Sequence, residues 1–401
     1  MKIDWQTKKL SEVCDFSNGL WKGKKPPYIN VGVIRNTNIT REGKLDDSDI
    51  AYLEVEEKQY SKRSLHYGDI ILEKSGGGPK QPVGRVIIFD KKDGDFSFSN
   101  FTSALRVKNP KELDFNFLHK FLFYSYISGV TEGMQSNSTG IRNLDMNTYK
   151  EVELPIPSLN EQKRIVKILD EAFDKIAKAK ENAEKNLQNS NDIFESYLNT
   201  IFTNPSRDHE TKQLGDIADV EYGYTDKAQS TGDYRFVRIT DTDEYGLLTV
   251  SNKMYVKDFK DSSKYLLAKG DLLMARTGAS AGNLMFFNSD EKAVFASYLI
   301  RIRMHKYIAG KLYWFFSKSR PYWDQVRLLS AGAAQPQFNG GALKQIVITF
   351  PRSLDEQKKI IKKLEEISEQ TKKLEENYKQ KIADLEELKK SLLTKAFAGE
   401  L

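Results

Sequence analysis

The sequence has few of the residues that metal and redox sites require. Its 401 residues include one cysteine, Cys14, which cannot form an internal disulfide. The four histidines lack the spacing of metal ligands and stand far apart, as His66, His119, His209 and His305. We therefore expect no metal site and no redox chemistry, and we assign structural or surface roles to these side chains.

Membrane segments and catalytic motifs are also missing. Nowhere do 18 apolar residues run together, and residues 1–6 lack the apolar core of a signal peptide, so we expect a cytoplasmic protein. The most aromatic stretch, residues 115–127, is too short to cross a bilayer and is predicted to be a buried helix. No glycine-rich nucleotide loop occurs. In Lys25-Pro26-Pro27-Tyr28, a lysine stands where amino-methyltransferases need a hydrogen-bond acceptor, so we expect no catalytic site.

What the sequence does contain is an internal repeat. Residues 158–166, SLNEQKRIV, return as residues 353–361, SLDEQKKII. Upstream of each segment, weaker landmarks keep their order, with Gly19, Gly68-Asp69 and residues 105–107 of the first copy matching Gly223, Gly270-Asp271 and residues 300–302 of the second. The chain is therefore predicted to be a tandem duplication of a globular unit followed by a long helix.

The repeat divides the chain into four regions. Residues 1–157 and 204–351 contain short apolar runs bounded by turn residues, which predicts two compact α/β domains. Residues 158–203 and 352–401 carry apolar side chains in steps of three and four with charged flanks, which predicts two long amphipathic helices. Both helix starts carry Ser or Asn/Asp followed by Glu-Gln, which predicts an N-terminal cap.

Neither long helix is expected to be stable alone in water, because its apolar stripe needs a partner. The other copy is tethered in the same chain, so we predict an intramolecular antiparallel coiled coil with pseudo-twofold symmetry that separates the two globular domains. The alternative that the stripes form the cores of helical hairpins stays open, because heptads do not fix the orientation of the helices.

Three polar loops interrupt the apolar strands in each globular domain. Arginine, lysine, asparagine and glutamine are the side chains that pair with base edges in DNA, and glycine lets the backbone approach phosphate. The loops occupy similar positions in the two copies but differ in sequence, as expected if each copy reads a different short DNA sequence. The candidate DNA-contacting residues are Arg35, Asn36, Lys74, Ser75, Lys80, Gln81, Arg142 and Asn143 in the first copy, and Arg238, Thr240, Arg276, Thr277, Ser280, Gln335, Gln337 and Asn339 in the second.

These features resemble the specificity subunits of Type I restriction-modification systems. The resemblance rests on Gly-Asp followed by Lys74-Ser75-Gly76 or Arg276-Thr277-Gly278, and on residues 155–166, and it covers the whole chain twice. Two departures are that residues 350–353 lack a second proline and that Gly76-Gly77-Gly78 enlarges one loop.

The resemblance implies two target-recognition domains, inverted with respect to each other, that read a bipartite DNA site while the coiled coil acts as a ruler. It also implies two adenine-N6 methyltransferase subunits and two ATP-driven translocase and nuclease subunits as partners. S-adenosylmethionine, ATP and magnesium would belong to those partners, and this chain would hold no cofactor.

One other function remains open at this point. A coiled-coil scaffold with two protein-binding globular ends would show the same architecture. An enzyme that combines recognition with methylation is not expected, because this chain is too short and has too few motifs for it. Steep salt dependence and sequence preference in DNA binding distinguish a DNA reader from a scaffold.

Overall fold

The computed structural model describes residues 5–21, 23–78, 81–138, 140–243, 245–330 and 338–401. The chain divides into two compact units: unit 1 comprises residues up to Ala183 together with Gln380–Leu401, and unit 2 comprises Glu184–Lys379. Both units contain helices and strands, so the expected mixed class is confirmed. Each also holds part of the two long helices, α5 (Leu159–Thr203) and α10 (Leu354–Ala398). In the described part of the chain, no helix is both long and apolar enough to cross a bilayer.

The globular part of unit 1 is built on a four-stranded antiparallel sheet. Its strand order is β2 (Cys14–Asn18), β9 (Thr102–Val107), β5 (Ile70–Glu73) and β7 (Val86–Ile88). A second sheet has the order β4 (Ala51–Glu56), β3 (Tyr28–Ile34) and β8 (Phe96–Phe98). A third has the order β10 (Gln135–Ser138), β11 (Ile141–Leu144) and β6 (Ser75–Gly76), and β1 (Gln6–Lys9) pairs with β12 (Glu153–Ile156). Strand β5 is buried throughout, which explains its continuous apolar run.

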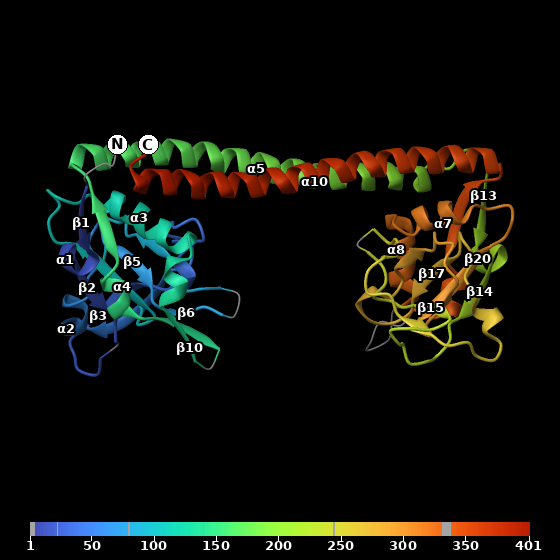
Figure 1. Ribbon diagram of the computed structural model, residues 1–401, viewed down its shortest axis with the longest axis horizontal. Helices are drawn as coiled ribbons and strands as arrows, with labels where there is room; N and C mark the ends of the chain where they lie inside the picture. Colours follow the sequence, from blue (N-terminus) through green and yellow to red (C-terminus); the bar gives the residue numbers. More distant parts are fainter. Residues whose placement is uncertain (1–4, 22, 79–80, 139, 244, 331–337) are drawn as a thin grey trace. The chain divides into compact units, whose positions relative to one another are not determined.

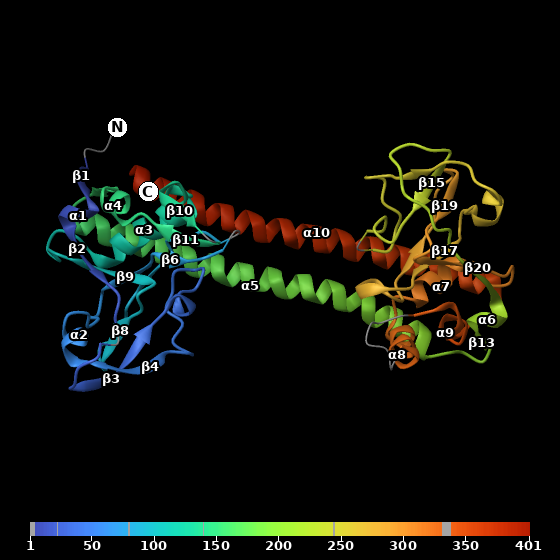
Figure 2. The ribbon, with the colours of Figure 1, turned by 90° about the horizontal axis from the view of Figure 1, so that it is seen from below.

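The helices of unit 1 are short apart from α5 and α10. They are α1 (Leu10–Val13), η1 (Asn36–Asn38), α2 (Glu57–Ser61), α3 (Phe115–Ile127), η2 (Val130–Met134) and α4 (Met146–Lys150). Within this unit, α3 lies between the central sheet and the long helices, and β4-β3-β8 lies on the other side of that sheet (Figures 1 and 2).

Helix α3 forms where the sequence predicts a buried helix. The carboxylate of Asp114 caps its start by accepting hydrogen bonds from the backbone N–H groups of Asn116 and Phe117, at 2.9 and 3.1 Å. Phe117 and Phe121 pack edge-on against Phe397 of α10, with ring centroids 5.4 and 5.3 Å apart. These rings belong to one buried core that joins α3 to both long helices.

The portions of α5 and α10 that belong to unit 1 run antiparallel. Arg164 near the start of α5 donates to the carbonyl of Leu401, just beyond the end of α10. Further along α5, Lys180 pairs with Glu386, an earlier residue of α10, at 2.6 Å. Rising residue numbers in one helix therefore meet falling numbers in the other.

Unit 2 repeats this plan, with fewer strands among its described residues. Its central sheet has the order β14 (Ala218–Tyr222), β20 (Leu299–Met304), β17 (Leu272–Ala275) and β18 (Leu284–Phe286). The second sheet has the order β16 (Tyr255–Val256), β15 (Tyr234–Val237) and β19 (Ala293–Phe295), and β13 (His209–Gln213) pairs with β21 (Val347–Pro351). The helices are α6 (Leu214–Ile217), η3 (Ser262–Tyr265), η4 (Gly278–Ser280), α7 (Gly310–Phe316), α8 (Arg320–Leu329) and α9 (Gly340–Lys344).

The strand registers correct one alignment within the repeat. The registers of β9 on β5 and of β20 on β17 make Arg106 equivalent to Arg303, whereas the sequence comparison matched Arg106 to Arg301. Side chains alternate along a strand with a period of two, so a shift of two positions leaves the apolar pattern unchanged. Only the pairing of the strands could show the error.

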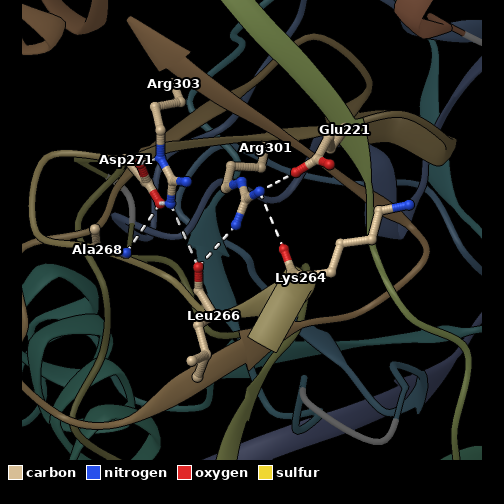
Figure 3. A network of polar contacts seen from close by, with 7 residues as sticks. All are labelled: Glu221, Lys264, Leu266, Ala268, Asp271, Arg301 and Arg303. Atoms are coloured by element: carbon tan, nitrogen blue, oxygen red, sulfur yellow. Dashed lines mark hydrogen bonds and ion pairs between the residues drawn. The ribbon is translucent and has the colours of Figure 1, made fainter. Parts of the chain in front are cut away.

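The corrected alignment explains why the Gly-Asp pair occurs in both copies. Asp69 and Asp271 are buried, and each forms a two-pronged ion pair with an arginine, Arg106 or Arg303, whose Nη2 atom lies 2.6 or 2.7 Å from the carboxylate. Figure 3 shows the second of these pairs beside Arg301, which instead pairs with Glu221 and donates to backbone carbonyls. The aspartate therefore has a structural role.

The N-terminal cap predicted for the first long helix is confirmed, because the hydroxyl of Ser158 accepts a hydrogen bond from the N–H of Glu161 at 3.4 Å at the start of α5. The glutamine that follows Glu161 has a different role. The Gln162 side chain is buried and donates to the carbonyls of Glu112 and Pro157, at 2.9 and 2.8 Å, while accepting from the N–H of Asp114 at 2.8 Å. It connects the start of α5 to the loop before α3.

Gln357 makes the same three contacts in unit 2. Its amide donates to the carbonyls of Tyr307 and Pro351, at 3.1 and 2.8 Å, and it accepts from the N–H of Ala309 at 2.8 Å. We call Gln162 and Gln357 the glutamine clamps. In both units, therefore, one glutamine side chain satisfies two backbone groups just before α3 or α7 and a carbonyl just before α5 or α10.

Acid is expected to destabilise unit 1 through His119 of α3. Burial, with a smaller contribution from Lys120, lowers the pKa of His119 from 6.5 to about 4. The unfolded chain therefore binds a proton that the folded chain does not, and stability is lost as the pH falls from 6.5 towards 4. Urea unfolding should show that His119→Phe removes about 2 kcal/mol of the loss between pH 7.5 and pH 5. Equal losses in the variant and the parent would contradict this assignment.

Candidate nucleic-acid interface

In unit 1 the three predicted polar segments meet at one place. The amide Nδ2 of Asn36 donates to the carbonyl of Ser75 at 2.6 Å, and the hydroxyl of Ser75 donates to Oδ1 of Asn143 at 2.6 Å. Residues 35–38, 74–81 and 136–143 are thus joined by hydrogen bonds although they are far apart in the sequence.

Not all of these segments are loops, however. Residues 136–138 lie in β10 and residues 141–143 in β11, and these two strands pair with each other, while β11 also pairs with β6 through Asn143 opposite Ser75. These strands were not predicted from the sequence, because their residues are mainly polar and do not alternate with apolar ones. Pairing with a distant segment decides their structure. The loop prediction for this part of unit 1 is therefore wrong, although its residues do lie beside the other two segments.

Two cations in this group are held in defined positions. Nζ of Lys74 donates to Oδ1 of Asn18 at 2.9 Å, and partial burial lowers the pKa of Lys74. Nε of Arg142 donates to the carbonyl of Gly78 at 3.0 Å. These hydrogen bonds fix the orientation of the Lys74 and Arg142 side chains beside the three polar segments.

Two of the remaining candidates of unit 1 have contacts of their own. Arg35 forms an ion pair with the exposed carboxylate of Asp49 at 3.0 Å. The backbone of Gln81 exchanges hydrogen bonds with that of Gly78, at 3.1 and 3.0 Å. Lys80 lies outside the described residues.

A buried ion pair stabilises the three polar segments of unit 1. Arg85 forms a two-pronged pair with the fully buried Glu73, both contacts being 2.8 Å, and this hydrogen bonding raises the pKa of Arg85. The same guanidinium donates to the carbonyls of Ile39 and Asn36, at 2.5 and 3.3 Å. Arg85 therefore connects η1 to the end of β5.

In unit 2, Arg276 occupies the position of Lys74, directly after the buried strand. Its guanidinium lies over the ring of Tyr222, 5.4 Å from the centroid, and its carbonyl accepts from the N–H of Phe338 at 3.0 Å. The hydroxyl of Tyr222 in turn accepts from the N–H of Gly340 at 2.9 Å. The second and third polar segments of this unit are thus in contact.

The other candidates of unit 2 have varied surroundings. Arg238 is held by Asp241 through its Nη2, at 2.7 Å, and Thr240 is exposed. Thr277 directly precedes η4, which ends at Ser280. Asn339 caps α9 by accepting from the N–H of Ala342 at 2.9 Å. Gln335 and Gln337 lie outside the described residues.

The two copies share a framework but differ beneath the polar segments. Ala275 and Asn283 of unit 2 stand where unit 1 has Glu73 and Arg85, according to the strand registers. A cavity of about 410 Å³ occurs there, and its lining includes Ala275 and Asn283 together with Ile239 and Thr242. Unit 1 therefore has a buried ion pair at the position where unit 2 has a cavity.

Asn18 and Tyr222 also belong to these sites, although neither was among the predicted DNA-contacting residues. They are equivalent residues, each the last of its strand, and they contact Lys74 and Arg276 respectively. The available signal was their place in the repeat, because each directly precedes a glycine, Gly19 or Gly223, that marks both copies.

Comparison with known proteins agrees with this repeated arrangement. The family model of the Type I restriction modification DNA specificity domain matches residues 2–187 and again residues 206–384. The chain is 24% identical to the StySPI specificity subunit of Salmonella potsdam over 421 residues, covering 99% of this chain and 89% of that protein. It is also 24% identical to the EcoKI specificity subunit of Escherichia coli K12 over 428 residues, with the same coverage of 99% and 89%.

Two solved structures share the fold. One, from work on complex assembly and conformational transition of the type I R-M system, has a TM-score of 0.80 and 18% identity, covering 99% of this chain and 98% of that one. The other is the HsdS subunit from Thermoanaerobacter tengcongensis, with a TM-score of 0.63 and 18% identity, covering 99% of this chain and 97% of its own.

Proposed function

Because the chain belongs to the family of Type I restriction-modification DNA specificity domains, we propose that it reads DNA sequence as the specificity subunit of such a system. The observation that carries the proposal is the pair of equivalent cations, Lys74 and Arg276, each placed after a buried strand among polar segments. Their surroundings differ between the copies. Such a pair of sites suits two half-sites of different sequence better than it suits the two ends of a scaffold.

Arg276 is the strongest candidate for a base contact. An arginine guanidinium can donate two parallel hydrogen bonds to a guanine in the major groove, and stacking on Tyr222 limits the orientations it must give up on binding. Lys74, as a single point charge, is better suited to one acceptor on a base or phosphate. The remaining polar candidates, from Arg35 and Asn36 to Asn339, would complete the two contact surfaces.

Arg276→Ala is expected to lose about 1–3 kcal/mol of discrimination at one half-site and to leave the other half-site unchanged. Selection of bound duplexes from a randomised library by the full-length chain, at several salt concentrations, measures this. Equal weakening for every sequence, with a smaller salt dependence, would instead show a phosphate contact. A parent chain that selects no sequence would contradict the proposed function itself.

We further propose that the chain carries no catalytic site and acts with partners in the cytoplasm. Two adenine-N6 methyltransferase subunits and two ATP-driven translocase and nuclease subunits would supply the chemistry, along with S-adenosylmethionine, ATP and magnesium. The family of the chain supports this, as does the similarity of its fold to a chain from a type I R-M assembly.

The long helices would serve as a ruler between the half-sites. Their antiparallel contacts in unit 1 and their equal lengths of 45 residues support an intramolecular coiled coil along their whole length. Removing seven residues from each helix at matched positions, 184–190 and 376–382, should shorten the preferred spacer and leave both half-site sequences unchanged. Mapping of N6-methyladenine by long-read sequencing would detect this, and an unchanged spacer would contradict the ruler.

A further inference from the structure

Each unit exposes one large aromatic side chain on the turn that precedes the longest strand of its central sheet. Phe101 is 46% exposed just before β9, and Tyr298 is 59% exposed just before β20. The strand registers make these two residues equivalent. A single exposed aromatic side chain needs no explanation. Here, however, exposed aromatic side chains occur at the same position of both copies, although the side chains next to them differ. This coincidence requires an explanation.

Both turns are joined directly to the proposed DNA-contacting cations. The carbonyl of Phe101 accepts hydrogen bonds from the N–H groups of Lys74 and Ser75, at 3.0 and 3.1 Å. The carbonyl of Tyr298 accepts from the N–H of Arg276 at 3.1 Å. The backbone of each exposed aromatic residue is therefore hydrogen-bonded to the backbone of Lys74 or Arg276.

The turns are also held rigidly from the other side. In unit 1 the N–H of Thr102 donates to the carbonyl of Ser99 at 3.0 Å, and a Cβ atom added to Gly19 would lie 1.8 Å from that carbonyl oxygen. In unit 2 the N–H of Leu299 donates to the carbonyl of Ala296 at 2.8 Å, and a Cβ on Gly223 would lie 2.2 Å from its oxygen. The two glycine landmarks thus allow the end of one strand to pass directly against the turn.

We propose that Phe101 and Tyr298 are matched DNA-contacting residues, each packing its ring against the apolar edges of bases in the half-site that its unit reads. This inference rests on the proposed function. A ring on a rigid turn loses little conformational freedom on binding, and its exposed area is removed from water only when a partner covers it. Thymine methyl groups in the major groove provide an apolar surface beside the donors and acceptors that Lys74 and Arg276 would reach.

The test uses the full-length chain and duplexes that carry its selected bipartite sequence. Phe101→Ala and Tyr298→Ala should each weaken binding about tenfold or more, each through a different half-site, with an unchanged salt dependence. Tyr298→Phe should bind like the parent, because it keeps the ring. Replacing thymine by uracil in the half-site should weaken the parent and leave the corresponding alanine variant unaffected.

Exposed aromatic residues elsewhere in the same units provide matched controls. Tyr67 and Tyr307 are 52% and 41% exposed, and Tyr67→Ala and Tyr307→Ala should bind DNA like the parent. Thermal unfolding shows whether any variant has lost its fold. If the parent selects a sequence and either Phe101→Ala or Tyr298→Ala binds with unchanged affinity, the matched assignment is wrong while the proposed function stands. A loss accompanied by a smaller salt dependence would also overturn it, because it would indicate a phosphate contact. A parent without sequence selection would show that the proposed function has failed.

Discussion

Glu73→Ala is expected to lower the free energy of unfolding of unit 1 by about 3–5 kcal/mol, because it leaves the guanidinium of Arg85 largely buried without its counter-ion. The loss should extend to function, since Arg85 also donates to the carbonyls of Ile39 and Asn36 and so holds η1 in place. Urea unfolding measures the first effect. Selection from a randomised duplex library should show weaker preference at the half-site of unit 1 only.

The second copy of the repeat supplies the control for this experiment. Ala275 and Asn283 occupy the equivalent positions, so the double variant Glu73→Ala/Arg85→Asn gives unit 1 a pair that the same framework already accommodates. Removing both charges together should restore most of the lost stability, because no unpaired charge remains buried. A double variant as unstable as Glu73→Ala alone would show that the loss comes from packing and not from the unpaired charge.

The glutamine clamps should be nearly as sensitive to substitution. Gln162→Glu has almost the same shape, but a carboxylate cannot donate to the carbonyls of Glu112 and Pro157 and is repelled by both. We expect unit 1 to lose about 2–4 kcal/mol, since two buried acceptors become unpaired. Hydrogen–deuterium exchange should then rise in residues 109–117, where the clamp holds the start of α3.

The repeat again provides a matched experiment. Gln357→Glu should raise exchange in residues 305–312 of unit 2 and leave unit 1 unchanged. Glu161→Gln, at the neighbouring residue, removes only a surface ion pair with Arg164 and should cost less than about 1 kcal/mol. If Gln162→Glu is no more destabilising than Glu161→Gln, the clamp has no structural importance.

Much of the architecture could be predicted from the sequence because it depends on local periodicity. Steps of three and four between apolar residues predicted the helices now seen as α5 and α10, and the aromatic run predicted α3. The repeat of SLNEQKRIV showed that the chain contains two copies of one unit. Each of these signals lies within one stretch of chain, where side-chain spacing alone decides which face is buried.

Other features depend on contacts between distant segments and could not be predicted in this way. The hairpin β10–β11 consists of mainly polar residues that become strands by pairing with each other and with β6. The match of Arg106 to Arg303 required the strand register, and the role of Gln162 required its three buried partners. The same holds for Glu73 and Arg85, whose pairing no spacing in the sequence indicates.

The absence of catalytic and metal-binding motifs, the two copies and the long helices were thus determined by composition and periodicity, which the sequence displays directly. Which polar residues lie together, which cation is held by which neighbour, and how the two copies differ beneath their polar segments were decided by tertiary structure alone. The physical reason is that a hydrogen bond or ion pair depends on distances of about 3 Å between atoms. Only the folded chain brings residues such as Asn36, Ser75 and Asn143 within that distance.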